Sequence, residues 1–259
     1  MSRRLIVGNW KMYPTLSDAL VLTSSLKTAL EGVKGVEIAL APPTPWLVPV
    51  VESWHHKLEN VHFAAQDIWP HDQGAYTGQA SAFLLKNLVS YAIVGHSERR
   101  SYVGEDNDLI NDKVHACLRW GIKPILCVGE TKRLLDADGN TDSYQWSRLS
   151  IQLMEGLSGI KEEDLAKVSV AYEPVWAVGT KRPATPEYAL EVIGRLREKL
   201  SEKYPRRALG ELRILYGGDV DVQNAAGFMK YPEIDGFLLG REAVHARNFA
   251  KVCSTAASL

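Results

Sequence analysis

Eight short apolar runs recur along the chain, and the segments between them are amphipathic or polar. The runs occupy residues 4–10, 36–42, 61–67, 91–96, 123–129, 168–174, 213–218 and 235–240. Because their apolar character is continuous instead of alternating, they are typical of strands that are covered on both faces. Such strands, separated by helices, predict a parallel sheet with right-handed crossovers.

Eight strand–helix units predict a closed (β/α)8 barrel, and we expect residues 1–259 to form it as a single α/β domain. A length of 259 residues, of which 46% are hydrophobic, suits one barrel with a large core. A doubly wound open sheet is the alternative that the pattern alone leaves open. No low-complexity linker divides the chain, and the most polar stretch, residues 135–144, is expected to be an exposed loop.

Three of the intervening segments have helical patterns. Residues 17–32 carry apolar side chains at helical spacing, with Ser17 as the expected N-cap. Residues 107–121 end on a glycine, as helices often do. Residues 185–204 open with a capping threonine and a proline in the first turn.

The charge balance and the cysteines exclude several classes of protein. With 30 basic and 31 acidic residues, the chain has no bulk attraction for nucleic acid or an anionic membrane. No apolar run approaches the roughly 18 residues that span a bilayer, and the N-terminus is typical of a first strand, not a signal peptide. The three widely spaced cysteines argue against a disulfide framework or a zinc site, so a cytoplasmic location is expected.

The carboxyl ends of the predicted strands carry polar residues that can act together. In a barrel of this kind all these ends meet at one mouth, where the chemistry takes place. The residues at the strand ends are Asn9, Lys11, Gln66, His96, Glu173, Gly217-Gly218-Asp219 and Gly240-Arg241. The two glycine-containing turns follow the last two strands, where barrels often hold phosphate on backbone N–H groups.

This set of residues indicates a reaction type. Lys11 adds positive charge to the expected phosphate site, Glu173 is a candidate base, and His96 is a candidate hydrogen-bond donor to a carbonyl oxygen. A base, an electrophile and a phosphate site together predict proton abstraction beside a carbonyl in a small phosphorylated molecule. Each residue also has a purely structural alternative, and we expect Arg99, Arg100 and Glu105 to be structural ion-pair members.

Several motifs resemble those of the triosephosphate isomerase family from end to end of the chain. They are VGNWKM (7–12), GAYTG (74–78), VGHSERR (94–100), GE (104–105), CVGET (127–131), AYEPVWAVGT (171–180), ATPE (184–187), YGG (216–218) and DGFLLG (235–240). So many segments in one order are far more specific than any single motif. The resemblance implies a TIM barrel and an aldose–ketose isomerase.

The resemblance also implies a role for each matched residue. Glu173 would move a proton between neighbouring carbons, and an uncharged His96 would stabilise the enediolate; this pair of roles is the well-known one of the family. Lys11, paired with Glu98, would lie beside the negative charge, and Asn9 would orient the substrate. Ser97 would hold Glu173 in the open site.

A lid is implied as well. It comprises Pro174, Val175, Trp176, Ala177, Val178, Gly179, Thr180, Lys181, Arg182, Pro183 and Ala184. Gly179 would give its N–H to the phosphate, together with the turns at Gly218, Asp219, Gly240 and Arg241. Closing the lid would keep water from an enediolate that can otherwise expel its phosphate. Thr77 would reach the site of a neighbouring subunit, which implies a homodimer.

Four positions depart from the family pattern. Asp219 stands where a serine is usual, Arg241 where a glycine is usual, and Gln79 where a glutamate is usual. The lid tip, usually Gly-Lys-Thr, is Lys181-Arg182-Pro183 in this chain. Because a carboxylate beside a phosphate dianion needs neutralising, we hypothesise a salt bridge from Asp219 to Lys181 in the closed lid. Pro183 is expected to restrict lid motion, since proline fixes φ near −65°.

The leading hypothesis for function is the interconversion of dihydroxyacetone phosphate and glyceraldehyde 3-phosphate. An isomerase of a longer sugar phosphate, such as L-erythrulose 1-phosphate, is the close alternative. A non-catalytic phosphate-binding barrel is a third, which the set Asn9, Lys11, His96 and Glu173 argues against. No cofactor or metal is expected, because the sequence has no metal-ligand spacing and no dinucleotide fingerprint.

Overall fold

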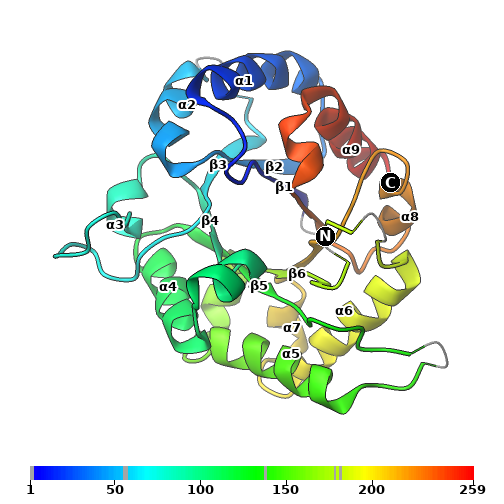
Figure 1. The fold of residues 1–259 in the computed structure, drawn as a ribbon. Helices are drawn as coiled ribbons and strands as arrows, with labels where there is room; N and C mark the ends of the chain where they lie inside the picture. Colours follow the sequence, from blue (N-terminus) through cyan, green and yellow to red (C-terminus); the bar gives the residue numbers. More distant parts are fainter. Residues whose placement is uncertain (1–2, 55–57, 137–138, 178, 181–182) are drawn as a thin grey trace.

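Eight parallel strands close into a barrel in which each strand pairs with its neighbours in chain order (Figure 1). The computed structural model describes residues 3–54, 58–136, 139–177, 179–180 and 183–259. The strands are β1 (Arg4–Asn9), β2 (Val36–Ala41), β3 (Val61–Ala65), β4 (Tyr91–Val94), β5 (Lys123–Val128), β6 (Ser169–Tyr172), β7 (Arg213–Tyr216) and β8 (Gly236–Leu239). The predicted barrel is confirmed, and the open-sheet alternative is wrong because β1 pairs with β8.

Helices surround the barrel on its outer face (Figure 1). They are α1 (Leu16–Leu30), α2 (Leu47–Ser53), α3 (Ala82–Leu85), α4 (Asn107–Arg119), α5 (Ser143–Gly156), α6 (Pro186–Ser201), α7 (Arg206–Leu209), α8 (Ala225–Met229) and α9 (Ala246–Ser258). The last helix packs beside the first, which brings the two ends of the barrel wall together. Among the described residues, none of the helices has the length and apolar character that crossing a bilayer requires.

The ends of the helices follow from their capping residues. Helix α1 begins earlier than predicted, because Thr15 and not Ser17 is its N-cap. Thr15 and Asp18 form a reciprocal capping box, in which each side chain accepts a backbone N–H of the other residue. For helix α6 the predicted cap is correct, since Thr185 accepts the N–H of Tyr188. Most described residues of the stretch expected to be an exposed loop are exposed, but Leu135 is buried and forms a β-bridge with Thr141.

The core has two layers, which explains why the strands are apolar throughout. One layer fills the barrel and consists of Leu5, Val7, Ala39, Ala41, Ala64, Tyr91, Ile93, Ile125, Cys127, Ala171, Leu215 and Leu238. The other lies between the barrel and the helices and includes the intervening residues, such as Ile6 of β1. Since successive side chains of a strand point to opposite faces, both sets must be apolar. The free cysteines are buried, and Cys127 packs inside the barrel.

A charged cluster closes the end of the barrel opposite the polar strand ends. Glu37 of β2 accepts hydrogen bonds from the Tyr91 hydroxyl and from Arg213 Nη1, the latter at 2.6 Å. Burial alone would raise the pKa of Glu37, but the Tyr91 and Arg213 contacts lower it from 4.5 to about 2. The ionised carboxylate therefore stabilises the folded state.

This cluster predicts part of the acid sensitivity of the fold. Because the folded-state pKa of Glu37 is depressed, its contribution is complete above pH 4.5 and is lost as the pH falls toward 2. We expect Glu37→Gln to cost about 1–3 kcal/mol of unfolding free energy at pH 7, allowing for partial solvent screening. Urea unfolding at pH 7, 5 and 3 measures this cost. The difference in unfolding free energy between the wild type and Glu37→Gln should narrow as the pH falls.

The matched control is Glu163→Gln, which removes a charge from an exposed carboxylate. It should follow the wild-type pH dependence of unfolding free energy. A gap between wild type and Glu37→Gln that stays constant from pH 7 to pH 3 contradicts the prediction.

Candidate active site

Residues from several strand ends line one cavity of about 290 Å³ at the mouth of the barrel. The lining residues are Asn9, Lys11, Tyr13, His96, Glu173, Gly179, Gly217, Gly218, Asp219, Leu238, Leu239, Gly240 and Arg241. Most of the predicted site residues therefore line one cavity, as expected for polar residues at the ends of barrel strands. Tyr13 is a lining residue that the sequence reasoning missed, and only its position two residues beyond Lys11 could have indicated it.

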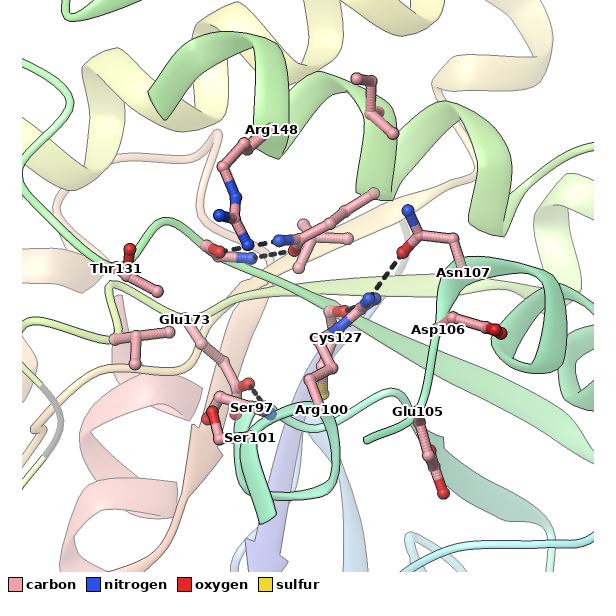
Figure 2. A pocket seen from close by; sticks show the side chains of 15 residues that line it. Ser97, Arg100, Ser101, Glu105, Asp106, Asn107, Cys127, Thr131, Arg148 and Glu173 are labelled. Atoms are coloured by element: carbon pink, nitrogen blue, oxygen red, sulfur yellow. Dashed lines mark hydrogen bonds between the residues drawn. The ribbon is translucent and has the colours of Figure 1, made fainter. Parts of the chain in front are cut away.

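Glu173 and His96 are in direct contact across the barrel. Glu173 follows β6, His96 follows β4, and Oε1 of the glutamate lies 2.9 Å from Nε2 of the histidine. The other oxygen, Oε2, accepts the backbone N–H of Ser97 at 2.9 Å (Figure 2). The side chains of Glu173 and His96 are both buried, with exposed fractions of 3% and 8%, respectively. The predicted contact of Ser97 with Glu173 is thus made by its backbone, not by its hydroxyl.

The surroundings of Glu173 keep it ionised. Burial by itself would raise the pKa of this carboxyl, but His96, the Ser97 N–H and Lys11 together lower it below the ordinary value. A buried carboxylate that is ionised and lies beside a cavity can act as a base.

The hydrogen bonds of His96 define which nitrogen carries its proton. Nδ1 accepts the backbone N–H of Glu98 at 3.2 Å, so a neutral ring carries its proton on Nε2, toward the cavity. Burial lowers the pKa of His96, and the adjoining Glu173 carboxylate outweighs this effect and raises it. Lys11 acts in the same direction as burial and lowers the pKa of His96, whereas Glu98 raises it.

Lys11 has an unusual backbone conformation for a lysine. Its φ of 50° is in the left-handed region, the one such non-glycine residue in the described part of the chain. Its N–H donates to Asn9 Oδ1 at 2.9 Å, and its carbonyl accepts from Gln66 Nε2 at 2.9 Å. The Lys11 ammonium lies 2.5 Å from Glu98 Oε1, as expected for this pair. Strain held in this way at a cavity is a feature of functional sites.

The turns after β7 and β8 line the cavity beside Lys11 and Glu173. A Cβ at Gly240 would lie 3.0 Å from Lys11 Cε, and one at Gly217 would lie 2.9 Å from Glu173 Cγ. Glycine at these positions therefore lets the lysine and the glutamate approach the turns closely. Strand β8 is followed by a short 3₁₀ helix at Arg241–Val244, whereas after β7 the helix α8 begins only at Ala225.

The two charged departures at these turns pair with each other. Arg241 Nη2 lies 3.0 Å from Asp219 Oδ1. The hypothesised partner of Asp219, Lys181, lies outside the described residues, as do Val178 and Arg182 of the predicted lid. The Arg241 side chain, whose direction the sequence left open, thus faces Asp219.

Trp176 anchors the described part of the predicted lid. Its Nε1 donates to Glu130 Oε1 at 2.7 Å, and its ring packs edge-to-face on Tyr188 at 5.4 Å. The same Glu130 oxygen accepts from the Tyr172 hydroxyl at 2.8 Å, and burial raises the pKa of the Glu130 carboxyl above its ordinary value. Glu130 lies two residues beyond β5, so the strand-end rule could have identified it, but it was not singled out.

Charged residues behind the site hold the loop after β4 in place. Arg99 pairs with Glu105 at 2.6 Å and with Asp67 at 3.0 Å, and buried Lys113 contacts both carboxylates. Arg100 donates to the Gly95 and Cys127 carbonyls. It also donates to Asn107 Oδ1 (Figure 2). Figure 2 also shows the wall of a second cavity, about 460 Å³, to which Glu173 contributes from its other side.

The remaining predicted residues lie away from the cavity. Thr77 and Gln79 are exposed in the loop before α3, which protrudes from the barrel (Figure 1). Thr77 does not line the cavity of its own chain.

Comparison with known proteins adds an independent observation. A family model described as "Triosephosphate isomerase" matches residues 4–256. A triosephosphate isomerase of Herminiimonas arsenicoxydans is 42% identical over 257 residues, which cover 99% of this chain and 100% of the relative. Triosephosphate isomerases of Carboxydothermus hydrogenoformans and Fusobacterium nucleatum are 39% and 40% identical, each over 97% of this chain and 98% of the relative.

Proposed function

The chain belongs to the triosephosphate isomerase family, and from that premise we propose that Glu173 and His96 carry out its isomerisation of dihydroxyacetone phosphate to glyceraldehyde 3-phosphate. The single observation that supports these roles best is the 2.9 Å contact between the two side chains at a cavity of suitable size. Two groups so close can act on neighbouring atoms of one three-carbon substrate.

The proposed reaction begins with Glu173, which accepts a proton from the hydroxymethyl carbon beside the ketone. The electrons of that C–H bond form a carbon–carbon double bond, and those of the carbonyl move onto its oxygen, which gives an enediolate. His96 donates a hydrogen bond from Nε2 to the developing oxyanion, and Lys11 stabilises the charge. The hydroxyl proton of the neighbouring carbon then moves to this oxyanion by way of His96 Nε2, which leaves the negative charge on the other oxygen. Glu173 returns its proton to the former carbonyl carbon, and the charged oxygen re-forms a carbonyl at the neighbouring carbon.

We assign binding of the phosphate to the turns after β7 and β8. Backbone N–H groups of Gly218, Asp219, Gly240 and Arg241 would hold the dianion, with Gly179 from the lid above them. Asn9 would orient the substrate oxygens, since its side chain is buried and fixed by the Lys11 N–H. The residues 174–184 would close over the site and exclude water.

The test is a coupled assay that consumes glyceraldehyde 3-phosphate as it forms. The purified protein should convert dihydroxyacetone phosphate with a kcat/KM far above that on L-erythrulose 1-phosphate, assayed in parallel. Equal or better turnover of the four-carbon ketose would contradict the triose assignment, and no turnover of either would contradict isomerase activity.

A homodimer of residues 1–259 is also part of the proposal. Met12, Tyr13, Tyr76, Tyr102 and Val103 are exposed apolar or aromatic residues from the loops after β1, β3 and β4. Exposed apolar side chains gathered at one end of the molecule indicate a protein contact. We expect sedimentation equilibrium to give twice the mass of the chain, and Tyr102→Asp to shift the protein toward monomer. A wild-type protein that sediments as a monomer at micromolar concentration contradicts this prediction.

A further inference from the structure

A charged side-chain cluster at the edge of the cavity joins the turns that follow β7 and β8. We call the set Asp219, Arg241 and Glu242 the turn cluster. Arg241 Nη2 lies 3.0 Å from Asp219 Oδ1, and Arg241 Nε lies 3.3 Å from Glu242 Oε1. Because Asp219 and Arg241 both line the cavity, this cluster borders the proposed phosphate position directly.

The three members of the turn cluster differ in their exposure to solvent. The side chains of Asp219 and Glu242 have exposed fractions of 12% and 8%, whereas that of Arg241 is 45% exposed. Glu242 is itself fixed, since its Oε2 accepts a hydrogen bond from Asn248 of α9 at 2.8 Å. The guanidinium of Arg241 is therefore within ion-pair distance of two largely buried carboxylates.

The charges of the cluster matter for a bound dianion. A carboxylate with little exposure to water repels a nearby phosphate strongly, because solvent screens it poorly. Two carboxylates without the guanidinium would place two negative charges beside the phosphate turns. With Arg241 present, the charge of Asp219 is offset, and its oxygen is directed at the guanidinium.

We propose that Arg241 is a positioning residue that links the two phosphate-binding turns and offsets the charge of Asp219, so that a phosphate dianion can bind beside a carboxylate. This inference rests on the proposed function and deepens it, because it assigns a role to two positions that depart from the family pattern. Arg241 acts through Asp219 and the backbone of the turns. It should therefore affect binding of the phosphate end more than the proton transfer.

A double-mutant cycle of Asp219→Ser and Arg241→Met tests the coupling. Methionine keeps much of the aliphatic stem of arginine and removes its charge. We expect Arg241→Met to raise KM, and the Ki of inorganic phosphate as a competitive inhibitor, by about 10- to 100-fold, with kcat changed about threefold or less. In the Asp219→Ser background, the same arginine substitution should raise both by less than about fivefold, because the carboxylate is gone.

The matched control is Arg207→Met on α7, at the other end of the barrel, which removes the same charge from an exposed pair with Glu162. It should leave KM and the phosphate Ki unchanged. Thermal denaturation of all variants without ligand reports whether they fold. The proposal is overturned if Arg241→Met has the wild-type Ki for phosphate. It is also overturned if the arginine substitution raises this Ki by the same factor with and without Asp219.

Direct binding of inorganic phosphate separates this proposal from the proposed function. Thermal shift against phosphate concentration measures binding without any turnover. If the wild type binds phosphate and Arg241→Met binds it weakly, but neither isomerises a triose phosphate, the proposed function fails while the role of Arg241 stands. If the wild type isomerises and the phosphate affinities of the two proteins match, the role of Arg241 fails alone.

Discussion

Replacing Glu173 with glutamine is expected to lower kcat by about 10³-fold, within the range of losses typical for a general base. Glutamine has nearly the same shape and can still accept the backbone N–H of Ser97, which the glutamate accepts at 2.9 Å. It cannot accept a proton from carbon. The loss should therefore be in kcat, while KM changes little, and steady-state kinetics in the coupled assay measure both.

The control for this prediction is Glu173→Asp. It keeps a carboxylate but withdraws it by one methylene, so it should retain more activity than the glutamine variant, through a base that is less well placed. Unchanged kcat in Glu173→Gln would show that another group removes the proton. A fall in KM alone, without loss of kcat, would also contradict the assignment.

The pH profile gives the same assignment a second test. Because the pKa of Glu173 in the free protein is lowered below 4.5, the carboxylate stays ionised through the weakly acidic range. A fall in kcat/KM near pH 6 then reports the substrate, since the second ionisation of a phosphate monoester is near 6, together with His96, whose pKa Glu173 raises. A substrate-independent loss well above pH 4.5 that persists in His96→Gln would contradict an ionised Glu173.

The sequence was sufficient to predict the barrel and most of the cavity. Eight doubly covered strands can bury both faces in a closed barrel, and the polar residues at their ends then meet at one mouth. The barrel topology therefore brings the loop after β4, with His96 and Ser97, against Glu173. Ser97 and Glu173 are 76 positions apart in the chain. The local error at Thr15 was avoidable, because Asp18 three residues later completes a capping box.

Other features depend on geometry that strand ends alone do not define. The pairing of Asp219 with Arg241 requires the relative position of two turns, and a salt bridge to the lid was an equally reasonable expectation from charge alone. The left-handed backbone of Lys11 has no sequence signal, since lysine rarely adopts it. A local hydrogen bond to Asn9 and a long-range one from Gln66 hold this backbone in place.

Lys11 is the second residue whose loss should nearly abolish activity. Lys11 lies two residues beyond β1 and lines the cavity. Its ammonium is 2.5 Å from Glu98 Oε1. A single charge about 4 Å from a developing oxyanion contributes roughly 4 kcal/mol at an effective dielectric constant near 20, which corresponds to about 10³-fold in rate. We therefore expect Lys11→Met to lower kcat/KM by about 10³-fold.

The loss in Lys11→Met should be divided between the two kinetic constants. The ammonium attracts both the bound phosphate dianion and the enediolate, so KM should rise and kcat should fall, unlike the pure kcat effect at Glu173. Glu98→Gln is the matched control, because it removes the partner of the lysine but leaves its charge, and we expect a loss of about tenfold or less. If Lys11→Met loses no more than Glu98→Gln, the lysine acts only as the partner of Glu98, and the charge that stabilises the enediolate must come from elsewhere in the site.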